Sequence, residues 1–265
     1  MGLQCGIIGI TNVGKTTIFN CMSSTKAQAS NFAFSSNKSN ISIINVPDER
    51  LYVLEKYQPT DRSVHTTVEI VDIPGLAKGA NKGEGMGNSF LGDIRNCDAL
   101  IHVLRCFDDE NLPHVEGSVD PVRDIETVNF ELQVKDLESI DKKIQRLEKL
   151  IKTGDKDAKH GIEVLKIYKN HLESFQSART APVEESDKRF IADLSLLSTK
   201  PVIYVCNVDE ASAVNGNKYV DKVNEFLKSE NTETLVIAGK VEADIAELDS
   251  EEDRSVFLKD VGLTE

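Results

Sequence analysis

The sequence is short of positive charge, and this shortage excludes one broad mode of binding. It holds 31 Lys and Arg against 44 Asp and Glu, which gives a formal net charge of −13 and a pI of about 4.9. Because nucleic acid is a polyanion, so acidic a chain has no overall electrostatic attraction to it. Any contact with RNA would therefore need a local basic patch.

Cysteine is scarce and long apolar runs are missing. The five cysteines are scattered without a CxxC pair, and Cys5, Cys106 and Cys206 lie at or near the ends of apolar runs. A thiol in that position is usually a small buried hydrophobic group, which predicts a reducing compartment rather than a disulfide framework. No run is long enough to cross a bilayer, and the first residues already read as a strand, which leaves no room for a signal peptide. We therefore expect a cytoplasmic protein with no membrane partner.

The most informative motif is a glycine-rich loop near the N-terminus. Residues 9–16 read Gly-Ile-Thr-Asn-Val-Gly-Lys-Thr, the GxxxxGK[ST] phosphate loop, between an apolar run and a helical pattern. Its glycines let backbone N–H groups converge on an anion, and the helix N-terminus favours phosphate. Lys15 is predicted to place its charge between the β- and γ-phosphates, and Thr16 to supply a hydroxyl ligand for Mg²⁺. The alternative, a glycine-rich turn without a ligand, is disfavoured because strand, spacing and the Lys-Thr pair coincide.

Short apolar runs separated by helical segments indicate the fold class. The runs are residues 5–9, Thr67–Asp72, 99–106, 201–207 and 234–238. Such alternation is typical of an α/β protein with a doubly wound, mostly parallel sheet. Residues 35–40 are polar and residues 75–92 are rich in glycine, so both segments are predicted to be loops.

The pattern changes near residue 126, where two heptad-like stripes begin. The first is Leu137, Ile140, Ile144, Leu147 and Ile151, and the second is Ile162, Leu165, Tyr168, Leu172 and Phe175. Two such helices joined by a turn at Gly154 predict an antiparallel coiled-coil hairpin over residues 126–197. It would be inserted in a nucleotide-binding domain made of residues 1–125 and 198–265. The alternative is an ordinary pair of amphipathic helices packed on the sheet.

A second nucleotide motif, Asp72-Ile73-Pro74-Gly75, ends an apolar strand. In phosphate-loop switch proteins the Asp at this place holds Mg²⁺ through water, and the Gly amide meets the γ-phosphate. Leu76 follows where many GTPases carry the Gln that orients the attacking water, so unaided hydrolysis is expected to be slow. His102 and His114 are the candidates by residue type to replace it, although from the residues alone each reads as a structural or surface histidine.

Base selection is expected at Asn207-Val208-Asp209-Glu210, where GTPases carry NKxD. Val208 replaces the Lys that covers guanine, and Glu210 replaces the Asp that accepts from it. Adenine can instead donate its N6 amine to a backbone carbonyl such as that of Val208. The sequence therefore predicts ATP over GTP, with a GTP-preferring translational GTPase-like switch as the alternative.

Together the motifs resemble the Obg-like ATPases called the YchF family. The resemblance runs from Met1 to Glu265 and rests on the phosphate loop and on residues 72–85, 98–107, 114–121, 207–210 and 245–248. It implies a phosphate-loop GTPase fold that prefers ATP, a helical hairpin insert, and a C-terminal TGS domain expected beyond Glu265. It also implies association with the ribosome, at the large subunit, and with RNA.

The resemblance assigns roles to individual residues. Nucleotide contacts fall on Asn12, Val13, Gly14, Lys15, Thr16 and Thr17, magnesium on Thr16 and Ser36, and adenine on Asn207 and Val208. The group that assists hydrolysis falls on His114. K⁺ is a plausible further cation, because Asn12 stands where some cation-activated relatives use Asn as a ligand.

Two outputs remain open from the sequence: an ATP-hydrolysing enzyme, and a nucleotide-gated binding module whose hydrolysis resets a switch. Leu76 and the glycine-rich loop favour the switch, whereas a small-molecule kinase fits poorly because no acceptor site is visible. The hairpin cations, with Lys78, Lys82 and Arg95, could form local patches for RNA. A solvated helix face is the alternative for the hairpin cations.

Overall fold

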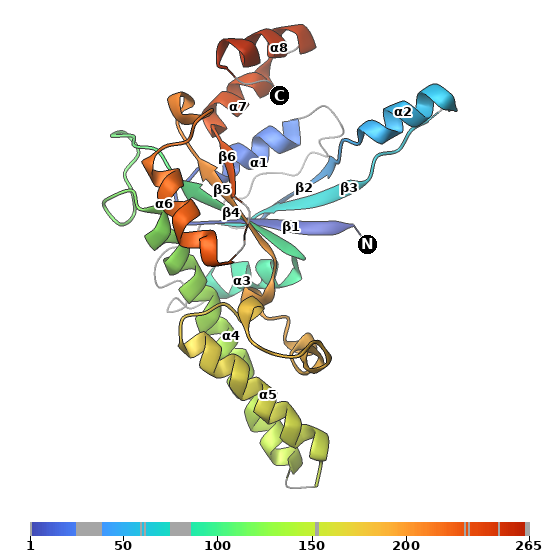
Figure 1. Cartoon of the computed structure of the whole chain (residues 1–265), viewed down its shortest axis with the longest axis vertical. Coiled ribbons are helices and arrows are strands. Elements are labelled where there is room, and N and C mark those ends of the chain that lie inside the picture. Colours follow the sequence, from blue (N-terminus) through green and yellow to red (C-terminus); the bar gives the residue numbers. More distant parts are fainter. Residues whose placement is uncertain are drawn as a thin grey trace.

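The computed structural model describes residues 2–24, 39–58, 60, 62–74, 86–151, 154–230, 232, 234–248 and 250–262. At its centre lies a six-stranded sheet in the order β2-β3-β1-β4-β5-β6 (Figure 1). The strands are β1 (Leu3–Ile8), β2 (Asn40–Asn45), β3 (Thr67–Asp72), β4 (Ala99–Arg105), β5 (Val202–Asn207) and β6 (Thr234–Ile237). Neighbouring strands are parallel except β2 and β3, which are antiparallel. The predicted α/β, mostly parallel architecture is confirmed.

Two segments predicted as loops are partly regular. Residue 40, at the end of the predicted loop 35–40, begins β2, whose residues alternate between partial burial and exposure along the sheet edge. Helix α3 (Met86–Asn96) begins inside the glycine-rich segment 75–92, of which residues 75–85 lie outside the described part. Buried Leu91 and Ile94 anchor α3, and this tertiary packing outweighs the low helix propensity of its glycines.

Helices cover both faces of the sheet (Figure 1). On one face α1 (Lys15–Ser24) packs against α7 (Gly239–Glu247), with α8 (Glu251–Asp260) beyond it. On the other lie α3, the first half of α4 (Pro121–Ile151), and α6 (Lys218–Leu227). Helix α2 (Glu49–Tyr57) stands at the far end of β2 and β3 and buries no residue.

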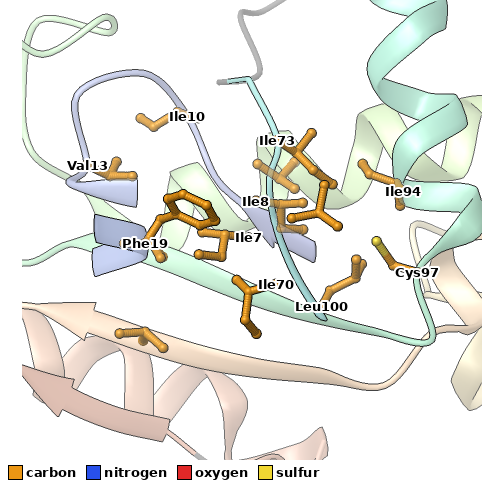
Figure 2. Close-up of a cluster of buried hydrophobic side chains, with 14 of the residues drawn as sticks. Ile7, Ile8, Ile10, Val13, Phe19, Ile70, Ile73, Ile94, Cys97 and Leu100 are labelled. Carbon is orange, nitrogen blue, oxygen red and sulfur yellow. The ribbon is translucent and has the colours of Figure 1, made fainter. Parts of the chain in front are cut away.

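The main core surrounds β1, as Figure 2 shows for Ile7, Ile8, Phe19, Ile94 and Leu100. Burial of each such aliphatic side chain contributes roughly 1.5–3 kcal/mol. The core therefore fixes the carboxyl end of β1, which leads into the phosphate loop.

Helices α4 and α5 (Lys156–Glu173) form the predicted hairpin, which projects away from the sheet (Figure 1). The seam buries Ile140, Leu165 and Leu172, as expected from the heptad pattern. The prediction that Phe175 belongs to the second stripe is wrong, because this residue follows the end of α5, has φ of 60°, and is 71% exposed.

The first two turns of α4 pack on the sheet domain rather than belonging to the free hairpin. The helix starts at Pro121, earlier than the expected change at residue 126, because proline suits the first helical position. Ile125 and Val128 are fully buried in the two clusters that flank the sheet. One continuous helix therefore joins the sheet core to the hairpin, and the division at residues 126 and 197 stays a prediction.

A buried carboxylate fixes the return from the hairpin. Asp136 accepts hydrogen bonds from the N–H groups of Leu197 (2.7 Å) and Ser198 (2.8 Å) and from the Ser198 hydroxyl (2.6 Å). Burial raises the pKa of Asp136, although these bonds oppose the shift. The segment η5 (Leu197–Thr199) is thereby tied to α4 just before the chain re-enters the sheet.

Among the described residues, no helix has both the length and the apolar character required to span a bilayer.

Candidate nucleotide-binding site

A cavity of about 930 Å³ opens at the carboxyl ends of the parallel strands. Its lining is drawn from the segments that follow β1, β3, β4, β5 and β6, together with the start of α1 and Asn40. In open α/β sheets this edge is where ligands bind, because loops from several strands converge there. Of the predicted site residues, it brings together Asn12, Gly14, Lys15, Thr16, Thr17, Asp72, Asn207 and Val208.

The phosphate loop requires glycine at two positions. A Cβ on Gly9, whose φ is +145°, would lie 2.5 Å from the Val103 carbonyl oxygen. A Cβ on Gly14, whose φ is +97°, would lie 2.3 Å from Nδ2 of Asn207. Val13 is predicted to contact nucleotide, and its side chain is buried in the core, which leaves only its backbone for that role. The loop is thus packed against β4 and β5 as closely as backbone permits.

Lys15 is held at the centre of this loop. Its Nζ donates to the carbonyl oxygen of Ile10 at 2.7 Å, and the side chain is buried. Burial lowers the pKa of Lys15 to about 8, with the charge of Asp72 opposing the shift. An anion bound in the loop would favour the protonated form of Lys15 and raise its pKa. The buried ammonium group would thereby acquire a partner of opposite charge.

Thr16 and Asp72 form the candidate magnesium site. The Thr16 hydroxyl donates to Oδ2 of Asp72 at 2.9 Å, and both residues line the cavity beside Lys15. Burial raises the pKa of Asp72, while hydrogen bonds from Thr16 and Asn40 and the charge of Lys15 oppose the shift. Hydroxyl and carboxylate oxygens are the hard ligands that Mg²⁺ prefers, so the donor set fits this ion. The predicted residues Ser36 and Gly75 lie outside the described part of the chain.

Asn207 ties three loops together at the other end of the site. Its Nδ2 donates to the Val13 carbonyl oxygen and its Oδ1 accepts from the Gly239 N–H, both at 2.9 Å. The residue is buried, and each polar group already has a backbone partner. In this arrangement Asn207 positions the phosphate loop against the start of α7, and its predicted contact with adenine stays a prediction.

The rest of the base motif surrounds the outer part of the cavity. Val208 packs its side chain into the core, and its N–H donates to the Ile237 carbonyl oxygen at 2.9 Å. Asp209 caps the short helix η6 (Glu210–Ser212) by accepting from the Ser212 N–H. Glu210 is exposed and lines the cavity. The motif position that holds a lysine in GTPases is thus a buried valine, while Lys240 after β6 also lines the cavity.

Arg105 is an organising residue that the sequence analysis missed. Its buried guanidinium donates to the carbonyl oxygens of Leu112 (2.7 Å), Phe107 (3.2 Å) and Asp109 (3.2 Å). These bonds shape the loop after β4, which lines the cavity through Phe107, Asp108, Asp109 and Leu112. The available signal was a charged residue at the end of a mostly apolar strand, since arginine is seldom buried without partners. Asn40 and Lys240, which also line the cavity, carried no such signal.

His114 is close in sequence to this loop but does not line the cavity. Its side chain is 3% exposed, and its Nε2 lies 3.1 Å from Oδ2 of Asp124 on α4. Because Nδ1 accepts from the Glu116 N–H at 3.1 Å, the proton is on Nε2 and is donated to Asp124. The predicted assisting group is therefore buried and fully engaged in this conformation.

His102 behaves as the structural residue that its position indicated. It is buried in β4, and its Nε2 has no hydrogen-bond partner within the described part. Burial first, and then the charges of Lys15 and Arg179, lower its pKa to about 3. The imidazole is therefore neutral at physiological pH.

The loop, the Thr16–Asp72 pair and their place at the carboxyl edge of the sheet define the class of phosphate-loop nucleotide-binding domains. A family model described as 50S ribosome-binding GTPase matches residues 4–240. Two similar relatives are the ribosome-binding ATPases YchF of Bacillus subtilis and Escherichia coli O157:H7, each 43% identical. The alignments cover 100% of this chain and 73% and 72% of those relatives.

A solved structure, of the Schizosaccharomyces pombe YchF GTPase, matches with a TM-score of 0.84 and 30% identity. The match covers 100% of this chain and 72% of that one. The chain belongs to the YchF family, as its motifs indicated. It spans about three quarters of the length of these relatives.

Proposed function

We propose that this chain binds and slowly hydrolyses ATP with the help of Mg²⁺, and that the bound nucleotide controls its association with the ribosome. The observation that carries the proposal is the arrangement of Lys15 and the Thr16–Asp72 pair within one cavity. An ammonium group and two hard oxygen ligands at the mouth of a glycine-rich loop are the groups that a magnesium-bound triphosphate needs.

Each group has a distinct task in this proposal. The N–H groups of residues 12–17 and the N-terminus of α1 hold the phosphates, while Lys15 turns from the Ile10 carbonyl toward them. Thr16 would hold Mg²⁺ directly and Asp72 would hold it through water, with Ser36 as a third ligand. When bound, the ion neutralises charge that develops on the phosphate oxygens. K⁺ at Asn12 belongs to the same proposal, since Asn12 lines the cavity with a left-handed φ of 64°.

Slow turnover is supported by the position of His114. We propose that it assists hydrolysis, yet its imidazole is buried and donates to Asp124. The loop around His114 must rearrange before the ring can reach a phosphate or a water. Leu76 cannot orient water in its place. Basal hydrolysis is slow if it requires this rearrangement, and slow hydrolysis suits a switch better than a metabolic enzyme.

Nucleotide choice is the first point to test, because the relatives differ in the nucleotide that their names give. We expect ATP to bind tighter than GTP. Glu210→Asp should raise affinity for GTP relative to ATP. The double variant that also carries Val208→Lys should raise this ratio by about tenfold. Titration of the purified protein with both nucleotides and Mg²⁺ measures this.

Because Val208 is buried, thermal unfolding must show that the double variant is folded. Glu210→Asp alone changes an exposed side chain, so of the two variants this one is expected to disturb folding less. Wild-type protein that binds GTP about tenfold tighter than ATP would contradict the proposal.

Association with the ribosome is the second point to test. The acidic chain should cosediment with large ribosomal subunits to a different extent with a non-hydrolysable ATP analogue than with ADP. Small subunits serve as the control particle. Equal sedimentation in both nucleotide states, or with both subunits, would contradict the proposed switch or its proposed target.

A further inference from the structure

A second cavity, of about 710 Å³, lies between α3, α4 and the short helix η4 (Ala192–Leu194). It shares no lining residue with the nucleotide site. Its ionisable lining consists of five cations and two acids: Arg95, Lys135, Lys142, Lys143 and Arg146, with Glu138 and Asp193. So basic a cavity is unexpected in a chain of net charge −13.

The two acids neutralise only part of this charge. Asp193 forms salt bridges with both Lys143 and Arg146, the latter at 3.2 Å. Lys143 also donates to the Phe190 carbonyl oxygen at 2.6 Å. Glu138 pairs with Lys135 at 3.0 Å. Within the described part of the chain, no acid lies at salt-bridge distance from Arg95 or Lys142. The cavity therefore keeps two cations without a salt-bridge partner, Arg95 on α3 and Lys142 on α4, although the charge of buried Asp136 acts on Arg95.

The arrangement differs from a solvated helix face. Four of the cations lie on α4, but Arg95 comes from α3 and Asp193 from the segment that returns from the hairpin. Buried Leu91 and half-buried Leu194 form the apolar part of the lining. Like charges gathered in a concave, partly apolar setting repel one another more than on an open surface. A bound anion would relieve that repulsion.

We propose that this cavity is a phosphate-binding site, whose ligand is either the backbone of RNA or a free polyphosphate. Arginine offers a fork of donors that matches phosphate oxygens, and lysine adds a mobile point charge. A phosphate bound by both Arg95 and Lys142 would bridge α3 to α4, and Lys135, about two helical turns before Lys142, would complete the site. The inference goes beyond the proposed nucleotide chemistry, since it concerns a different surface.

The test compares two double variants that remove the same charge. Arg95→Gln with Lys142→Gln changes the cavity and leaves the Asp193 pairs intact. Lys149→Gln with Lys159→Gln changes exposed positions of the hairpin that do not line it. Glutamine keeps helix propensity close to that of lysine and arginine, so both proteins should fold, which circular dichroism checks. Lys142→Glu, a single change at an exposed position, is the reserve variant.

Two probes distinguish the sources of phosphate. Calorimetry with tripolyphosphate, in an excess of ADP that occupies the phosphate loop, reports a free polyphosphate. Fluorescence anisotropy of a labelled single-stranded RNA 12-mer reports backbone binding. We expect at least one probe to bind about tenfold more weakly to the cavity variant and less than about twofold more weakly to the control. For RNA, the slope of log affinity against log salt should fall by about 1.4.

Binding of tripolyphosphate that the cavity variant weakens identifies a free polyphosphate as a sufficient ligand, and an effect on RNA alone identifies the backbone. Equal losses in both double variants would overturn the site, because charge alone would then explain them. Unchanged binding of both probes would overturn it as well. Neither Arg95 nor Lys142 lines the nucleotide cavity, so the basal ATPase rate of the variant should equal that of wild type in every case. Failure of the site is therefore distinguishable from failure of the proposed ATPase.

Discussion

Lys15→Met is expected to lower affinity for a nucleoside triphosphate by about a hundredfold or more. The substitution keeps the length of the side chain and removes the ammonium group, which the phosphate loop surrounds. Hydrogen bonds from a charged donor contribute about 1.5–3 kcal/mol each, and a lysine offers several to a triphosphate. Titration with a non-hydrolysable ATP analogue and Mg²⁺ measures the loss.

The folded state should tolerate this change. Burial lowers the pKa of Lys15 to about 8, so the protein bears a cost for keeping the ammonium charged below that pH. The unfolded chain binds its proton up to a pKa near 10.4, and stability should therefore rise with pH between about 8 and 10.4. Lys15→Met removes this dependence, which is on the order of 3 kcal/mol at most. Denaturant unfolding of both proteins at pH 7 and pH 10 measures the difference.

The same pKa makes nucleotide binding depend on pH. Below pH 8 free Lys15 is charged, whereas above it the ligand must draw a proton into the site. Affinity for the triphosphate should fall by up to about tenfold from pH 7 to pH 9 in wild type. A pH-independent affinity, or a Lys15→Met protein that binds as tightly as wild type, would show that the triphosphate lies elsewhere.

Asn207→Asp should be the most damaging isosteric change in the site, although Asn207 need not touch a phosphate. The amide Nδ2 donates to the Val13 carbonyl oxygen, and a carboxylate would set an anionic oxygen against it at the same place. The Gly239 N–H would keep an acceptor. The buried carbonyl loses its donor and gains a repulsive neighbour, so we expect a loss of about 2–4 kcal/mol in the free energy of unfolding.

Nucleotide affinity should fall with it, because Val13 lies within the loop that we propose to hold the phosphates. Asn224→Asp is the matched control: Asn224 is exposed on α6 and uses its Oδ1 to accept from the Thr234 hydroxyl, which aspartate preserves. Denaturant unfolding and nucleotide titration of both variants give the comparison. Equal stability of the two proteins would refute the role of Asn207 as the residue that joins the loops.

Local sequence was sufficient to predict a motif or an element wherever its residue pattern lies within one continuous segment. The phosphate loop was found because glycine, lysine and threonine have fixed spacing between a strand and a helix. Five strands were found because a buried parallel strand is a continuous apolar run. The hairpin seam followed from spacing along single helices, and the family resemblance from several such motifs in order.

Other features depend on partners that are distant in the chain. Strand β2 alternates weakly at a sheet edge, and only its pairing with β3 makes it a strand. Helix α3 contains glycines, and its burial against the core decides its conformation. His114 has an ordinary loop sequence, and only the approach of Asp124 on α4 shows that it is enclosed.

The sequence by itself therefore determined the family and the proposed phosphate loop, since the groups proposed to bind phosphate are consecutive residues with fixed local geometry. Tertiary structure alone decided how the site is held and which cations gather in the second cavity. Asn207 reaches a loop 194 residues away, and Arg95 on α3 lines the same cavity as Lys142 on α4. The physical reason is that hydrogen bonds and charges act over a few ångströms of space, and folding, not chain order, sets those separations.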